Sequence, residues 1–201
     1  MTVTAEFLFD FGSPNAFLAH KVIPEIEKRT GVKFAYKPVL LGGIFKATGN
    51  QSPVQAFGHI KNKLAYEQLE TQRFIRKHAI AGFQFNPFFP VNTLNLMRMA
   101  VAAQKEGNLP KYMDAIFHHM WIEPKKMDDP EVAIKAFNAS GLDAAKLFAR
   151  AQETEIKAKL IENTQSAVER GAFGSPTFFV GKDMFFGKEQ LREVEELVSG
   201  K

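Results

Sequence analysis

The chain has 201 residues, a length that suits one domain or one domain with an insertion. Its net charge is only +4, and no run of Lys and Arg is interleaved with aromatic residues, so the composition argues against nucleic acid as a partner. The chain contains no cysteine, which excludes disulfides, thiolate-metal sites and cysteine nucleophiles.

The N-terminal residues, MTVTAE, lack the basic and apolar segments of a secretory signal. No uninterrupted apolar run is long enough to span a bilayer, so we expect no membrane association and a cytoplasmic location. Because the chain has 20 Phe against 3 Tyr and 1 Trp, we expect an aromatic core and a ligand pocket with aromatic walls.

The first forty residues predict a strand, a helix and a second strand. Residues 6–11 read EFLFDF, an aromatic-rich run typical of a buried strand. A helix is expected from Pro14 to about Gly31, where Pro24 should kink or split it. Apolar and polar residues then alternate over 32–37, as in a strand. A βαβ unit of this kind implies a parallel strand pair.

The middle of the chain, from about Pro53 to Gly171, carries almost only helical signals. Gly and Pro residues separate periodic segments. These predicted helices cover residues 54–79, 92–106, 111–121, 130–139, 143–149 and 154–170.

The C-terminal part returns to strands. Residues 177–180 and 184–186 flank the turn Gly-Lys-Asp and predict a β-hairpin. An amphipathic helix follows, with Leu191 and Val198 on its apolar face.

This order of elements predicts an α/β chain with a thioredoxin-like fold interrupted by helices. We expect residues 1–47 and 154–201 to form the thioredoxin-like domain and residues 48–153 to form an all-helical insertion domain.

Ser13 and Pro14 stand where the first strand meets the first helix. A helix N-terminus presents unpaired N–H groups and a partial positive charge, so a cysteine there would be a redox nucleophile. A serine lacks that chemistry, but its hydroxyl can donate a hydrogen bond to the thiolate of a bound ligand. Taken alone, Ser13 is more simply explained as a helix N-cap.

Ser175 and Pro176 precede the third predicted strand. In a thioredoxin fold this loop faces the start of the first helix and holds a cis-proline. We therefore expect a cis bond here, with the preceding peptide group free to pair with a ligand backbone.

Four segments resemble 2-hydroxychromene-2-carboxylate isomerase and the related kappa-class glutathione transferase. They read FDFGSPNAFLA, LGGIFKATGN, FPVNTLNLMR and GAFGSPTFFVGKDMFFG, and they extend over essentially the whole chain. The resemblance implies a thioredoxin-like domain with a helical insertion, in the layout of the disulfide-exchange enzyme DsbA. It also implies a homodimer that binds glutathione.

The resemblance further implies roles for individual residues. Ser13 matches a catalytic serine that hydrogen-bonds the glutathione sulfur. Further positions match residues that contact glutathione or lie near it, and these are Asn50, Lys63, Ser175, Pro176, Lys188 and Glu189. Ser175 and Pro176 belong to the loop that pairs with the cysteinyl part of glutathione. Lys188 and Glu189 lie where a polar pair holds its γ-glutamyl end.

By this resemblance the chain is expected to be a glutathione-dependent isomerase of 2-hydroxychromene-2-carboxylate-like substrates in aromatic compound catabolism, such as naphthalene degradation. Two alternatives stay open: a kappa-type transferase or peroxidase that uses the same thiolate site, and a non-catalytic thioredoxin-fold binding module.

Other polar pairs favour structural roles. His118 and His119 are adjacent on a predicted helix and should point in different directions, so we expect no metal site. Asp128 and Asp129 precede Pro130 and are interpreted as a helix-start cap and loop. Trp121 could line a pocket for an aromatic substrate, although core packing explains it equally well.

Overall fold

The computed structural model describes residues 4–200; residues 1–3 and 201, at the outer ends of the predicted domain ranges, lie outside the described part. Four strands form one mixed sheet in the order β2-β1-β3-β4. They are β1 (Ala5–Phe9), β2 (Phe34–Pro38), β3 (Thr177–Val180) and β4 (Asp183–Phe186). β1 pairs with β2 in parallel, as the βαβ pattern predicts, and β3 pairs with both β1 and β4 in antiparallel. The predicted hairpin is therefore confirmed.

Helices make up most of the rest of the chain. They are α1 (Pro14–Thr30), α2 (Leu41–Thr48), α3 (Pro53–Phe57), α4 (Lys63–Lys77), α5 (Leu94–Lys105), α6 (Leu109–Trp121), α7 (Pro130–Ala139), α8 (Ala144–Ala151), α9 (Thr154–Glu169) and α10 (Leu191–Val198), with a short 3₁₀ helix, η1 (Lys188–Gln190).

The helices differ from the sequence-based expectation in three respects. α1 continues through Pro24 as a single helix, so the expected split does not occur. The long helix predicted over 54–79 is divided into α3 and α4 by the non-helical segment 58–62, whose last residue, Asn62, adopts a left-handed φ of 70° that a right-handed helix does not accommodate. α2 was not predicted, because Gly42 and Gly43 weaken its helical signal.

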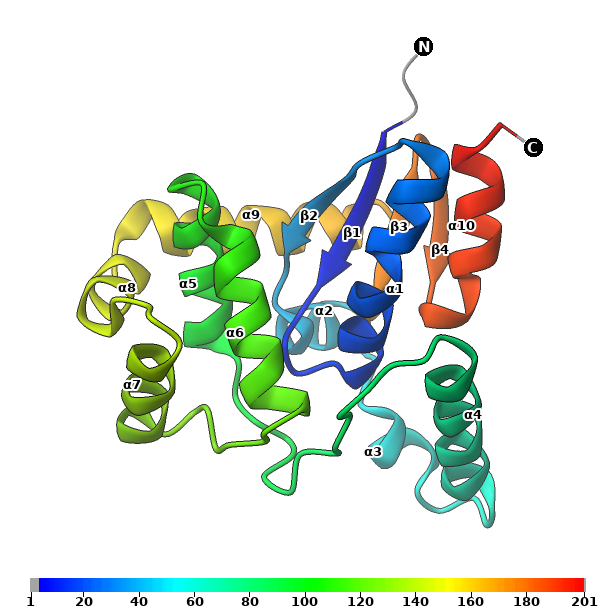
Figure 1. Cartoon of the computed structure of the whole chain (residues 1–201), viewed down its shortest axis with the longest axis horizontal. Coiled ribbons are helices and arrows are strands. Elements are labelled where there is room, and N and C mark those ends of the chain that lie inside the picture. Colours follow the sequence, from blue (N-terminus) through cyan, green and yellow to red (C-terminus); the bar gives the residue numbers. More distant parts are fainter. Residues whose placement is uncertain (1–3, 201) are drawn as a thin grey trace.

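The sheet is covered on both faces (Figure 1). α1 and α10 pack on one face, where Phe7 and Phe9 of β1 are fully buried in the larger core. α2 and α9 pack on the other face, where Leu8 lies in a second core with Ile44 and residues of α9. The alternation along β1 therefore sends successive side chains to opposite cores.

The helices between α2 and α9 form two separate groups (Figure 1). α3 and α4 lie on one side of the N-terminal end of α1, and α5–α8 lie on the other. The segment 78–93 crosses between them below that end of α1. The larger core continues from the sheet into α6 through aromatic side chains, with Phe11 and Phe117 only 4.8 Å apart between ring centroids. The expected aromatic core is confirmed. Among residues 4–200, no helix has both the length and the apolar character needed to cross a membrane.

Candidate active site

Ser13 forms the junction between β1 and α1. Its backbone is extended, with φ −97° and ψ 113°, and its Oγ accepts the backbone N–H of Ala16 at 3.1 Å. Pro14 occupies the first helical position and has no N–H to satisfy. Within residues 4–200, the N–H of Asn15 has no hydrogen-bond acceptor. The predicted N-cap is confirmed, and the start of α1 retains one free donor beside the serine.

The Ser175–Pro176 peptide bond is cis, as predicted, and the Ser13 hydroxyl donates to the Ser175 carbonyl at 2.8 Å. Both serines are buried, with exposed fractions of 5% and 8%. The two serines, 162 residues apart in the sequence, thus meet in one site. The Ser175 carbonyl, expected to be free for a ligand, is already bonded. Its N–H is without an acceptor among the described residues.

Asp10 organises the backbone in front of Ser13. Its carboxylate accepts the N–H of Gly12 at 2.8 Å and the N–H of Leu41 at 2.7 Å, and its own N–H donates to Ser175 Oγ at 3.2 Å. Complete burial raises the pKa of the Asp10 carboxyl, while these two N–H groups and the Thr93 side chain oppose that rise. Asp10 therefore joins the β1–α1 loop, the start of α2 and the cis-proline loop.

Our sequence reasoning missed Asp10. The available signal was an acidic residue near the end of the apolar run EFLFDF, where an unpaired charge is costly.

Asn50 lies beside the cis-proline loop. Its Nδ2 donates to the Phe173 carbonyl at 2.7 Å. The Phe173 ring contacts the Phe186 ring, with centroids 4.4 Å apart, and both rings are partly exposed. Asn50 and an accessible aromatic pair therefore flank the segment that carries Ser175.

The charged groups of Lys63, Lys188 and Glu189 contact other side chains of the protein and do not contact Ser13 or Ser175. Lys63 Nζ lies 3.1 Å from Glu67 Oε1, within its own helix. The Lys188 ammonium pairs with Glu189 and is buried, and it lies 5.4 Å from the centroid of Phe74 in α4. Of this second pair, only Glu189 is exposed. A role for any of them in binding glutathione stays a prediction.

Trp121 supports the loop between β1 and α1 by a hydrogen bond to its backbone. It is fully buried, and its Nε1 donates to the Phe11 carbonyl at 2.8 Å. The alternative that Trp121 packs in the core is therefore the one the structure supports. Phe85 contacts the buried indole, with ring centroids 5.9 Å apart, and is itself exposed.

A family model described as a DSBA-like thioredoxin domain matches residues 4–199. The chain belongs to this family.

Two enzymes illustrate the relatives of this DSBA-like chain. A 2-hydroxychromene-2-carboxylate isomerase from Sphingobium xenophagum is 27% identical over 198 residues, which cover 97% of each chain. Glutathione S-transferase kappa 1 from Rattus norvegicus is 26% identical over 205 residues, covering 98% of this chain and 91% of the rat protein.

The solved structures agree on the fold. One of a 2-hydroxychromene-2-carboxylate isomerase superposes with a TM-score of 0.83 at 24% identity, covering 98% of this chain and 95% of the other. Pseudomonas aeruginosa DsbA superposes with a TM-score of 0.59 at 18% identity, covering 99% and 83%. The predicted thioredoxin-like fold with the DsbA layout is confirmed.

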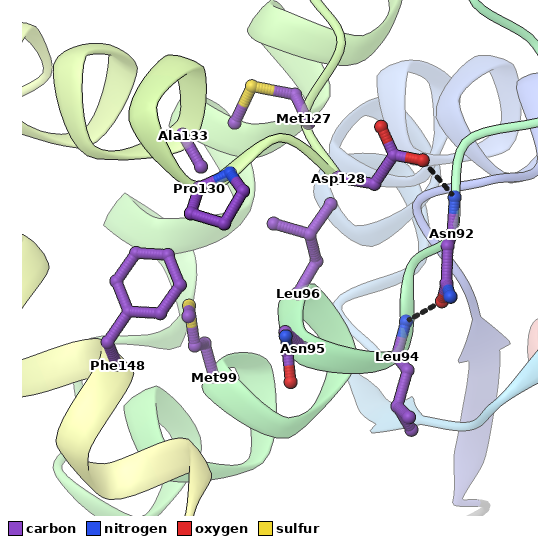
Figure 2. A pocket seen from close by; sticks show the side chains of 10 residues that line it. All are labelled: Asn92, Leu94, Asn95, Leu96, Met99, Met127, Asp128, Pro130, Ala133 and Phe148. Atoms are coloured by element: carbon purple, nitrogen blue, oxygen red, sulfur yellow. Dashed lines mark hydrogen bonds between the residues drawn. The ribbon is translucent and has the colours of Figure 1, made fainter.

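A small cavity of about 200 Å³ lies in the helical part of this DSBA-like chain (Figure 2). Its wall includes Asp128, whose carboxylate accepts the N–H of Asn92 at 3.3 Å. Asp129 caps α7 by accepting the N–H groups of Glu131 and Val132, as predicted. Ser13 and the other predicted site residues do not line this cavity.

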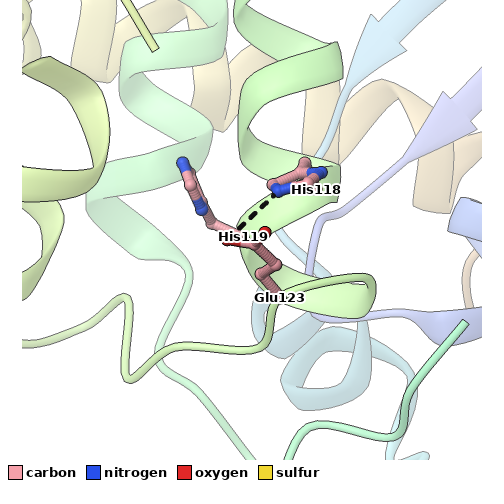
Figure 3. Close-up of side chains that lie close together, drawn as sticks. All are labelled: His118, His119 and Glu123. Atoms are coloured by element: carbon pink, nitrogen blue, oxygen red, sulfur yellow. Dashed lines mark ion pairs between the residues drawn. The ribbon is translucent and has the colours of Figure 1, made fainter. Parts of the chain in front are cut away.

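His118, His119 and Glu123 come closer together than adjacent helix positions suggest (Figure 3). One ligand atom from each lies within 4.8 Å of the others, while the planes of the two imidazole rings differ by 84°. However, His119 Nε2 bonds Ser140 Oγ at 2.9 Å and its Nδ1 faces the Lys125 ammonium at 3.1 Å. Burial and this ammonium lower the pKa of His119 to about 4. The cluster is thus a hydrogen-bonded charge network in which His119 offers no free ligand nitrogen to a metal.

Proposed function

We propose that this chain is a glutathione-dependent isomerase of 2-hydroxychromene-2-carboxylate-like aromatic substrates, with trans-o-hydroxybenzylidenepyruvate as the type of product. The observation that carries the proposal is the Ser13 hydroxyl at the start of α1, 2.8 Å from the carbonyl of the cis-proline loop, in a chain without cysteine. The relatives named as isomerases, at about the same length, support the same activity.

The residues at this site fit the groups of glutathione. The free N–H of Asn15 presents one donor to an anion at the positive end of α1, and the Ser13 hydroxyl provides a second when its proton turns from the Ser175 carbonyl to the anion. The free N–H of Ser175 can pair with a peptide carbonyl, and Asn50 sits next to that loop. Lys63 and Glu189, both accessible to solvent, are proposed to hold the charged ends.

When bound, glutathione supplies a thiolate that adds reversibly to the substrate and leaves unchanged, so the overall reaction is an isomerisation. The protein's part is to hold that sulfur deprotonated. Hydrogen bonds and the helix dipole favour the charged form and lower the pKa of a thiol placed there. Asp10 supports the position of these donors, because its carboxylate holds the backbone of the loop before Ser13 and the start of α2.

The test compares Ser13→Ala with a matched control, Ser52→Ala, which removes a serine cap from α3. Isomerisation of 2-hydroxychromene-2-carboxylate is followed with and without glutathione, and glutathione binding is measured by calorimetry. We expect Ser13→Ala to lose about 100-fold or more in kcat, in the range seen when one donor to a developing anion is removed, and Ser52→Ala to keep full turnover. Equal, glutathione-dependent turnover in the wild type and Ser13→Ala contradicts the role given to Ser13.

A kappa-type transferase or peroxidase is the second candidate, favoured by the 26% identity to the rat enzyme over nearly the full chain. Net consumption of glutathione with a halogenated or peroxidic electrophile supports it, whereas unchanged glutathione supports the isomerase. A chain that binds no glutathione is neither enzyme and agrees with the non-catalytic binding module.

We further propose that the chain acts as a homodimer in the cytoplasm, in the breakdown of aromatic compounds such as naphthalene. Sedimentation analysis tests the assembly, and growth of a deletion strain on naphthalene tests the pathway.

A further inference from the structure

A larger hollow of about 560 Å³ lies where α2, α5 and α9 meet. Its volume falls within the range of about 300–1,000 Å³ that is usual for small-molecule sites. Its described lining contains no acidic side chain and none of the residues assigned above to the active site. It is therefore a separate feature of the molecule.

The floor of this hollow is aliphatic. Leu40, Leu94, Leu160, Ile161 and Val168 line it, and the Ile161 side chain is 56% exposed. An apolar surface of this kind is stabilised when an apolar group covers it.

Three cations line the same hollow, each from a different helix. They are Lys46 of α2, Arg98 of α5 and Lys157 of α9. None of the three makes an ion pair or a side-chain hydrogen bond with any residue in the range 4–200. In contrast, Lys159 of α9, outside this lining, is 2.6 Å from Glu162. Unneutralised positive charge is thus concentrated around an aliphatic floor.

We propose that this hollow binds an amphipathic organic anion, namely a carboxylate with a medium-length aliphatic body. The body covers the leucine and isoleucine floor, and the carboxylate meets Arg98, whose guanidinium matches a carboxylate with two parallel hydrogen bonds. Lys46 and Lys157 add attraction to the same anion. A second copy of the chain fits poorly, because a two-fold axis through the hollow would bring two identical patches together, each with three cations and no acidic side chain in its described lining.

The hollow lies close to the proposed active-site loop, but none of the residues of that loop lines it. The Leu40 N–H donates to Thr164 Oγ1 at 3.0 Å, and the next residue, Leu41, donates to Asp10 at 2.7 Å. Since Ser13 is not part of the hollow, the proposed binding does not depend on the proposed catalytic function.

The experiment is a calorimetric titration of the full chain with three probes. Decanoate carries both features, decyltrimethylammonium carries the body with the opposite charge, and acetate carries the carboxylate alone. We expect saturable binding of one decanoate per chain, with no saturation by the other two. The double variant Arg98→Gln/Lys157→Gln should bind decanoate at least about tenfold more weakly, because charge-assisted hydrogen bonds are lost. Lys159→Gln, the matched control on α9, and Ser13→Ala should bind as the wild type does, and circular dichroism checks that each variant is folded.

Four results would overturn the proposal. Decanoate fails to saturate; decyltrimethylammonium binds as tightly as decanoate; or the folded double variant keeps the wild-type affinity. In the fourth, the double variant changes the sedimentation coefficient while decanoate does not bind, which assigns this face to a subunit interface instead.

Discussion

Replacing Ser13 by alanine tests the internal hydrogen bonds of the site independently of catalysis. The change removes the cap on Ala16, worth about 1 kcal/mol. It also leaves the buried Ser175 carbonyl without its donor, which costs about 1–3 kcal/mol. Together these losses predict a decrease of about 2–4 kcal/mol in the free energy of unfolding, a large share of the roughly 5–15 kcal/mol typical of a domain.

Urea unfolding measures this loss. Far-ultraviolet circular dichroism reports the helices, and the fluorescence of Trp121, the single tryptophan, reports the loop, because its indole bonds the Phe11 carbonyl. Ser52→Ala is the control, since Ser52 caps α3 at Gln55 but supports no buried carbonyl. If Ser13→Ala loses no more stability than Ser52→Ala, the Ser13–Ser175 bond contributes nothing to folding and the reasoning fails.

Three further predictions concern neighbouring features. Burial raises the pKa of the Asp10 carboxyl, so the contribution of this carboxyl to stability is fully present below about pH 3.9 and is lost as the pH rises through the folded-state pKa. The difference in unfolding free energy between the wild type and Asp10→Asn should therefore fall as the pH rises through that value, and a difference that does not change with pH contradicts the prediction. A Cβ on Gly174 would lie 2.7 Å from Phe186 Cε2, so Gly174→Ala should lower the unfolding free energy by about 1–3 kcal/mol, whereas Gly42→Ala, with open space around it, should not; equal values refute the clash. Burial and Lys125 lower the pKa of His119 to about 4, so the contribution of this imidazole to stability is present above about pH 6.5 and is lost as the pH falls toward 4. Between about pH 6.5 and 4, His119→Gln should lose less unfolding free energy than the wild type or His59→Gln, and identical pH profiles of the three proteins contradict the prediction.

Several local features, at the candidate site and elsewhere in the chain, were predictable from the sequence. Ser13 as an N-cap, Pro14 at the first helical position and the 130–139 helix all follow from short-range rules. The cis bond before Pro176 followed once the order of elements indicated the fold.

The missed features depend on contacts between distant segments. The buried Asp10 carboxylate accepts a hydrogen bond from the N–H of Leu41, 31 residues away, and no residue near Asp10 in the sequence indicates that partner. The separation of α3 from α4 takes the five residues 58–62, and it includes a left-handed backbone at Asn62 that the helical periodicity of the sequence does not indicate. The division into residues 1–47 with 154–201 and residues 48–153 stays a prediction.

The hydrogen bond from Ser13 to the Ser175 carbonyl predicts that the proposed thiol site is selective for the protonation state of its ligand. A ligand can take this proton only by being a better acceptor than a peptide carbonyl. A neutral thiol is a weak acceptor and loses that competition, whereas a thiolate, carrying a full charge, wins it. Binding of a thiolate therefore exchanges the hydrogen bond from Ser13 to the Ser175 carbonyl for one from Ser13 to the sulfur, and this exchange contributes only the difference between the free energies of the two bonds. Affinity for a thiol ligand should consequently rise with pH in step with ionisation of the sulfur.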